Sequence, residues 1–131
     1  MLTEKDYCDY DSCVALKELG YDGSPWECSC FGAYYRNGED IFYDRLFNSE
    51  LGEDEYLRVP LYLAQTWLKD EKNIIVDVFV DDDSDTPITY NVHKDGECVI
   101  HHHENYYSVK DWNVALLEGI KEAIRILKEE K

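Results

Sequence analysis

The sequence predicts an α+β domain in which an antiparallel sheet of three to five strands carries three helices, packed mainly on one face. Two observations support this class. An apolar stripe at helical spacing follows Pro60 and leads directly into the hydrophobic run 74–80, a pattern typical of a helix followed by a strand. Two more strand-like segments follow across short connections, which predicts an antiparallel meander over 74–103.

Composition limits both the size of the fold and the class of partner. The 131 residues fit a single domain over 1–131, and a hydrophobic fraction of 44% argues for a folded core despite a formal net charge of −16. Only 13 basic residues stand against 29 acidic ones. Because phosphate contacts need Lys and Arg, we expect no direct binding to nucleic acid and none to anionic lipid.

The N-terminal third predicts one helix and one hairpin. Thr3 followed by Asp6 resembles a capping box, so we expect a first helix from there to Gly20. Asn37-Gly38 lies between two aromatic-rich runs and predicts a β-hairpin over 31–43. Whether this hairpin joins the main sheet stays open, and residues 48–55 are expected to form an acidic loop.

The stretch Tyr56–Val80 predicts an apolar-striped helix that feeds a central strand, with Pro60 where a first helical position tolerates it. Its apolar stripe has spacings of three and four, and comprises Leu57, Leu61, Ala64 and Leu68. Asn73 is expected to end the helix in a left-handed conformation. The run 74–80 is apolar on nearly both faces, which favours a central position in the sheet.

The register of the last hairpin depends on its turn. A three-residue loop with Gly96 left-handed sets the even-numbered residues of 88–92 beside Cys98, Ile100 and His102, and we expect this arrangement. It places Cys98 in the core and leaves an outward face comprising Thr89, Asn91, His101 and His103. Ser108 is expected to start the final helix, whose stripe comprises Trp112, Leu116, Ile120, Ala123 and Leu127.

The run Val59–Asp70 is similar to the pattern P-x-x-x-A-Q-x-W-L-R, and Ala15–Tyr21 is similar to A-L-K-E-x-G-F. With these patterns the chain resembles small uncharacterised acidic proteins of gut bacteria and their phages. Tyr107–Leu127 resembles their closing helix, although Asn113-Val114-Ala115 replaces the usual acidic pair before Ala. The resemblance implies a small accessory protein of a phage, prophage or other mobile element, and it implies no site residues.

Metal binding is the alternative function that the residues allow. His101 and His103, two apart on a strand, project to one side and could share zinc with Glu104. Cys28 and Cys30 with Cys8 and Cys13 offer four thiolates, but one and four intervening residues depart from the usual zinc spacing, and buried small hydrophobes are the alternative. Asp81, Asp83 and Asp85 have calcium-loop spacing, but Thr86 and Val92 occupy the positions that need Gly and Glu.

No motif of the chain predicts catalysis or a cofactor. There is no Gly-x-Ser-x-Gly, no phosphate-cradling Gly-rich loop and no His-Glu-x-x-His, so we expect no enzyme activity. The first residues lack the basic and apolar regions of a signal peptide, and no run approaches the roughly 18 apolar residues of a membrane helix. Five irregularly spaced cysteines fit a reducing compartment, so we expect a cytoplasmic protein.

Binding to another protein is therefore the function that the sequence favours. The acidic loops are candidate contact residues for a basic partner, comprising Glu53, Asp54, Glu55, Asp81, Asp82, Asp83 and Asp85. The sharpest version is an inhibitor that fills a basic nucleic-acid groove by imitating phosphate spacing. The many aromatic residues either complete a small core or form an exposed surface for a partner, including a second copy of the chain.

Overall fold

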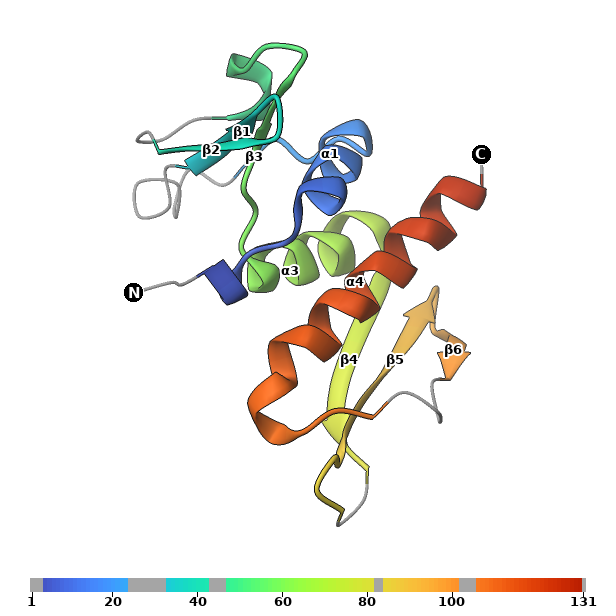
Figure 1. Ribbon diagram of the computed structural model, residues 1–131. Helices are drawn as coiled ribbons and strands as arrows, with labels where there is room; N and C mark the ends of the chain where they lie inside the picture. Colours follow the sequence, from blue (N-terminus) through green and yellow to red (C-terminus); the bar gives the residue numbers. More distant parts are fainter. Residues whose placement is uncertain (1–3, 24–32, 43–46, 82–83, 102–105, 131) are drawn as a thin grey trace. The chain divides into compact units, whose positions relative to one another are not determined.

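The computed structural model describes residues 4–23, 33–42, 47–81, 84–101 and 106–130. In these residues there are three α-helices and two antiparallel sheets of three strands each, so the α+β class is confirmed (Figure 1). The chain divides into two compact units, residues 1–6 with 61–131 and residues 7–60. The single domain over 1–131 stays a prediction.

The larger unit contains the predicted meander and two helices. Its elements are η1 (Glu4–Asp6), α3 (Leu61–Lys72), β4 (Ile74–Val80), β5 (Ile88–Lys94), β6 (Glu97–His101), η3 (Val109–Asp111) and α4 (Trp112–Glu129). The strand order is β4-β5-β6, so the predicted central position of 74–80 is wrong and β5 is central. Short connections make each strand pair with its successor, which leaves β4 with one partner strand among the described residues. Ile74 and Val76 are buried, whereas Ile75 and Asp77 are exposed.

Helix α4 covers one face of this sheet, and Figure 1 shows it crossing β4 and β5. The face turned inward carries the predicted stripe from Leu116 to Leu127, which is buried. Trp112, predicted as part of that stripe, is 39% exposed. Gly119 lies against Val76 and Tyr90, so the helix backbone approaches the sheet at a residue without a side chain. That all three helices share one face stays a prediction, because α1 belongs to the other unit.

Helix α3 begins later than predicted. It starts at Leu61, directly after Pro60, and ends at Lys72, where Asn73 has the predicted left-handed φ of 53°. This start is one residue after Pro60, the predicted first helical position, but Tyr56 and Leu57 are not part of the helix, because Glu55–Leu57 forms strand β3, which pairs with β1. Leu57 therefore belongs to a sheet and not to the helical stripe.

The β5–β6 hairpin differs from the prediction in its turn and in part of its pairing. Its turn is a two-residue loop, since Lys94 pairs with Glu97 and both Asp95 and Gly96 have positive φ. The predicted three-residue loop is wrong. A bulge beyond His93 then sets Val92 opposite Ile100, which restores the expected face for these residues.

Two further predictions for these strands are wrong. Cys98 lies opposite His93, between the turn and the bulge. It is exposed and is not in the core. Thr89, expected on the solvent face, is buried.

The smaller unit packs one helix against a second sheet. Its elements are α1 (Tyr10–Glu18), β1 (Ala33–Arg36), β2 (Glu39–Phe42), η2 (Asn48–Glu50) and β3 (Glu55–Leu57). The predicted Asn37-Gly38 turn joins β1 to β2, with both residues at positive φ. The hairpin pairs with β3 in the order β2-β1-β3, and in the described residues it does not join the β4–β6 sheet.

Helix α1 starts after the predicted position. Asp9 is its N-cap, and its carboxylate accepts a hydrogen bond of 3.0 Å from the Ser12 N–H. Residues Glu4–Asp6 form a separate short turn, and Thr3 lies outside the described residues. The predicted end is confirmed, because Gly20 has a φ of 109°.

Candidate functional site

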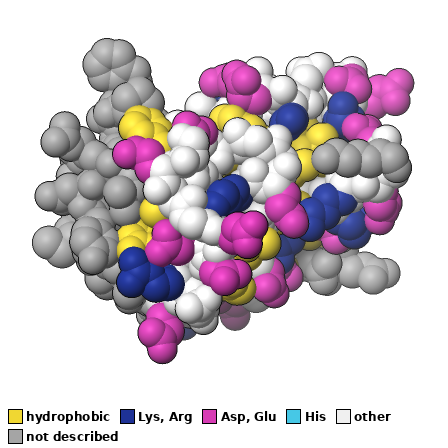
Figure 2. All heavy atoms as spheres, turned by 90° about the horizontal axis from the view of Figure 1, so that it is seen from above, with side chains coloured by type: hydrophobic (Ala, Val, Ile, Leu, Met, Phe, Trp, Pro, Cys, Tyr) yellow, Lys and Arg dark blue, Asp and Glu magenta, His cyan; other side chains and the backbone are white. Residues whose placement is uncertain are grey.

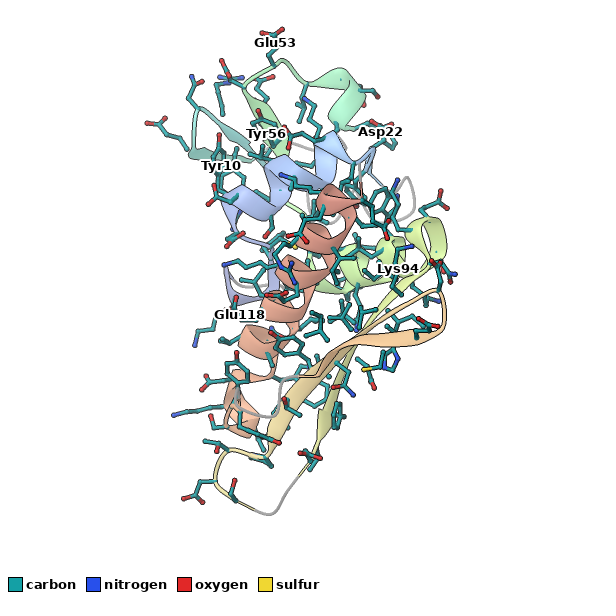
Figure 3. All side chains as sticks on the ribbon, turned by 90° about the vertical axis from the view of Figure 1, so that its right-hand side faces the viewer. Tyr10, Asp22, Glu53, Tyr56, Lys94 and Glu118 are labelled. Carbon is teal, nitrogen blue, oxygen red and sulfur yellow. The ribbon has the colours of Figure 1, made fainter. Side chains whose placement is uncertain are left out.

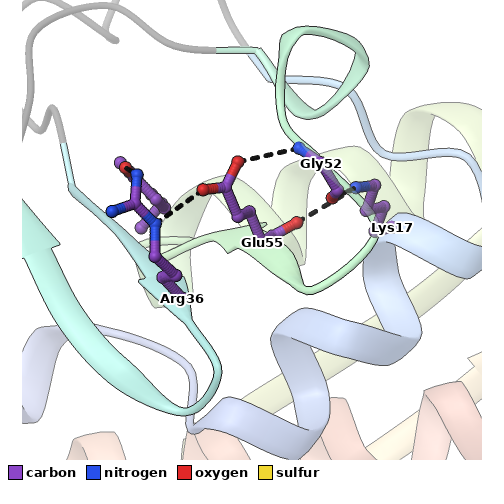
Figure 4. Close-up of polar contacts among 5 residues, drawn as sticks. Lys17, Arg36, Gly52 and Glu55 are labelled. Atoms are coloured by element: carbon purple, nitrogen blue, oxygen red, sulfur yellow. Dashed lines mark hydrogen bonds and ion pairs between the residues drawn. The ribbon is translucent and has the colours of Figure 1, made fainter.

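A lysine of helix α1 holds the acidic loop of the smaller unit by hydrogen bonds to its backbone. The Lys17 ammonium donates hydrogen bonds of 3.0 Å to the carbonyl oxygens of Gly52 and of Glu55 (Figure 4). It also lies 5.2 Å from the ring centre of Tyr56. This cation therefore holds the two ends of the acidic turn, defined here as residues 52–55.

An ion pair between strands β1 and β3 and a hydrogen bond within the turn also hold residues 52–55. Arg36 lies opposite Glu55 in the β1–β3 pairing, and its Nε donates to Glu55 Oε2 at 2.7 Å. The Gly52 N–H donates to Glu55 Oε1 at 2.8 Å. The Gly52 N–H, followed by the Arg36 guanidinium, lowers the pKa of Glu55. Glu55 is thus bound within its own loop.

The third described basic residue of this unit lies inside it. Arg58 is buried, with its guanidinium carbon 4.5 Å from the ring centre of Tyr7 and 5.5 Å from that of Tyr35. Tyr10 meets Tyr35 and Tyr56 edge-on, with ring centres 5.1 and 5.9 Å apart. The described tyrosines near Arg58 are half-buried and pack on its guanidinium or on one another. Tyr62 is exposed, so both readings that the sequence left open for the aromatic residues stay open.

Glu53 and Asp54 face the solvent at the tip of the acidic turn. Both are exposed, and among the ion pairs of the described residues none involves either carboxylate. Figure 3 shows Glu53 pointing away from the ribbon. Burial first, and then Tyr10 and the charges of Asp54, Glu18 and Glu53, raise the pKa of Tyr56.

The second predicted acidic loop connects β4 to β5 in the larger unit. Asp81 and Asp85 are exposed, and the Tyr106 hydroxyl donates a hydrogen bond of 2.6 Å to Asp81 Oδ2. Asp82 and Asp83 lie outside the described residues. On the face seen in Figure 2, acidic side chains are spread widely with Lys and Arg among them. Overall acidity therefore does not distinguish one loop, whereas the arrangement of cations around the acidic turn does.

The predicted metal ligands are not brought together among the described residues, which contain no group of three or more His, Cys, Asp or Glu suited to a metal. The backbone of His101 pairs with Asn91 in β6. His103, Glu104, Cys28 and Cys30 lie outside the described residues. Metal binding stays a prediction of the sequence.

Cys8 and Cys13 are buried in the smaller unit. The Val59 N–H donates to Cys13 Sγ at 3.4 Å, and Cys13 Sγ donates to the Cys8 carbonyl at 3.7 Å. Burial raises the pKa of both thiols, that of Cys13 to about 12. They pack as small hydrophobic groups, which is the alternative that the sequence left open for these two residues.

We expect this burial to make the protein sensitive to alkali. A thiol whose folded pKa is raised contributes stability below its unfolded pKa of about 8.5 and loses it as pH rises toward the folded value. The free energy of unfolding should therefore fall between about pH 9 and pH 12. Denaturant titrations at several pH values should give a shallower fall for Cys13→Ser, which keeps an acceptor for the Val59 N–H. An equal fall in the variant would contradict the assignment.

Asn48 is a structural residue of this unit that the sequence did not single out. It is buried, its Nδ2 donates to the Tyr21 carbonyl at 2.7 Å, and its Oδ1 accepts from the Leu57 N–H at 3.0 Å. It therefore ties the chain that leaves α1 to strand β3. No sequence pattern marks this asparagine, because both of its partners are backbone groups distant along the chain.

Comparison with known proteins places no constraint on the function, since no family model, no curated protein and no solved structure matches the chain. None of the described helices is both long enough and apolar enough to span a membrane.

Proposed function

We propose that the protein acts by binding a basic surface of another protein through the acidic turn. The observation that carries the proposal is the placement of the cations. In the described part of the smaller unit, Lys17, Arg36 and Arg58 contact carbonyls, a carboxylate and aromatic rings of their own unit. Among the described residues, no counter-charge lies within ion-pair distance of Glu53 or Asp54.

This arrangement favours a partner rich in Lys or Arg. Two exposed carboxylates on a turn that is fixed at both ends keep their relative positions, so a partner needs to order few side chains of this surface. The formal net charge of −16 adds long-range attraction for any cationic surface. Salt screens such attraction over a Debye length of about 10 Å at 0.1 M.

Within this proposal, the resemblance to phage-associated proteins favours an inhibitor of a basic, nucleic-acid-binding enzyme in the host cytoplasm. Such an inhibitor needs no catalytic group and no cofactor. It occupies the groove in place of phosphates, so its binding competes with nucleic acid and weakens with salt.

The test is capture of host proteins on immobilised chain at low salt, followed by a salt gradient and identification of what elutes. We expect a basic nucleic-acid-binding protein to elute at moderate salt. The variant Glu53→Gln/Asp54→Asn should elute that protein earlier, and its purified complex should show a dissociation constant raised roughly tenfold, or about 1.4 kcal/mol. Added nucleic acid should displace the protein.

The matched control is Glu71→Gln/Glu97→Gln, which removes the same number of charges from two exposed positions in the larger unit. Elution that shifts equally in both variants would show a general effect of net charge and would refute the role of the acidic turn. A captured partner that resists salt and ignores nucleic acid would refute groove mimicry.

A further inference from the structure

Alternate residues of β4 direct their backbone N–H and C=O groups toward β5, and the residues between them direct theirs toward the other edge of the strand. At one end the Asp95 N–H donates to the Asn73 carbonyl, and at the other the Asp81 N–H donates to the Pro87 carbonyl. Because pairing in an antiparallel ladder alternates with a period of two, the odd-numbered residues of 73–81 bond to β5. The even-numbered residues therefore point to the other edge. The Gln65 side chain confirms this direction, since its Nε2 donates to the Val76 carbonyl at 2.8 Å.

Beyond Gln65 this edge offers peptide groups and apolar side chains for pairing. In the described residues β4 has no other strand partner, which leaves the N–H and C=O groups of Val78 and Val80 directed outward. Val80 is 66% exposed and Ile75 is 43% exposed. Of the devices that usually protect an edge strand, the run 76–80 contains no Pro, Lys or bulge, and its one charged side chain is the exposed Asp77.

We propose that this edge is a self-pairing surface, on which the β4 strands of two copies join antiparallel about Val78 and make one continuous sheet. The sequence of β4 is self-complementary in that register. Val78 faces its own copy and Asp77 faces the partner's Phe79. Val80 faces the partner's Val76, whose carbonyl exchanges its hydrogen bond from Gln65 for one from the joining strand. No two carboxylates are directly opposite, and the even-numbered valines of both strands lie on the same face of the joined sheet.

Charge gives this association a recognisable salt dependence. Each copy has a formal net charge of −16, so two copies repel, and salt reduces the repulsion. Self-pairing therefore strengthens as salt is added, whereas binding of a basic partner at the acidic turn weakens. The two proposals rest on different units and respond to salt in opposite directions, so one can fail while the other holds.

The experiment is sedimentation velocity of the full chain over a wide range of protein concentration, at about 0.01 M and about 1 M salt, where the Debye length is about 30 and 3 Å. We expect a reversible monomer–dimer equilibrium with a dimer fraction that increases at high salt. Val80→Asp, which adds a charge at the edge, should abolish the dimer. Val114→Asp is the matched control, because Val114 is an exposed valine of helix α4 and its variant should associate as the wild type does.

A second pair of variants tests the phase of the backbone. Val78→Pro removes an N–H that points away from β5, so the fold should be retained and the dimer lost, since proline is tolerated on the open side of an edge strand. Phe79→Pro removes an N–H that bonds to β5 and should lower the thermal midpoint much more. A wild-type chain that remains monomeric at every concentration and salt would overturn the proposal, and so would a dimer that persists in Val80→Asp or in a folded Val78→Pro.

Discussion

Replacing Gly119 by alanine is expected to lower the free energy of unfolding of the larger unit by about 1–3 kcal/mol. A Cβ atom on Gly119 would overlap Val76 Cγ1 and would lie 3.2 Å from Tyr90 Cδ1. Both neighbours are buried, and a β-branched side chain in a packed sheet has few other rotamers. In an exposed helix the same substitution would stabilise by about 1 kcal/mol, so a loss of stability identifies the close helix–sheet contact as its cause.

The partner variant Val76→Ala makes this prediction specific. It removes the atom that the new Cβ would overlap, so Gly119→Ala should be much less harmful in its presence. Denaturant unfolding of the wild type, the two single variants and the double variant should give a coupling energy of about 1 kcal/mol or more. Additive effects would show that the two residues do not compete for the same space.

Local periodicity predicted most of the larger unit. The stripe of α4 from Leu116 to Leu127 and the meander over 74–103 are visible in the sequence because their spacing repeats within one element. The position of β4 within the sheet was not predicted correctly. The edge position follows from the strand order β4-β5-β6, which depends on hydrogen-bond pairing between strands, and apolar side chains on both faces of 74–80 do not reveal that pairing.

Non-local pairing explains the errors in the smaller unit. The segment from Tyr56 to Leu57 is compatible with a helical stripe, yet it forms a strand because Tyr35 and Tyr34 lie opposite it. Local sequence was sufficient to predict the β1–β2 turn at Asn37-Gly38 and the end of helix α1 at Gly20, since both need residues that adopt positive φ.

The candidate site could be predicted only in part. The acidity of residues 53–55 is read directly from the sequence, but the difference in hydrogen bonding and exposure among these three carboxylates is not. Glu55 is bound by Gly52 and Arg36, whereas Glu53 and Asp54 are exposed. This difference depends on a cross-strand register, and the pairing partner β1 lies far away in the sequence.

Replacing Asn48 is expected to give the largest loss of stability in the smaller unit. Its amide satisfies two buried backbone groups, the carbonyl of Tyr21 and the N–H of Leu57. Asn48→Ala leaves both without this partner, and each buried unsatisfied group costs about 1–3 kcal/mol, so we expect a total of about 2–5 kcal/mol. Chemical denaturation measures the loss. The neighbouring Ser49→Ala, at an exposed position, should change stability by no more than about 0.5 kcal/mol.

The isosteric variant Asn48→Asp separates hydrogen bonding from packing. Its carboxylate can still accept from the Leu57 N–H, but it meets the Tyr21 carbonyl with an acceptor in place of a donor. Burial raises the folded pKa of this new carboxyl above its unfolded value of about 3.9. The variant should therefore approach wild-type stability at low pH, where the protonated group donates to Tyr21, and lose stability as pH rises through the folded pKa. Equal destabilisation of Asn48→Asp at every pH, or a loss in Asn48→Ala no greater than in Ser49→Ala, would show that this asparagine does not hold the unit together.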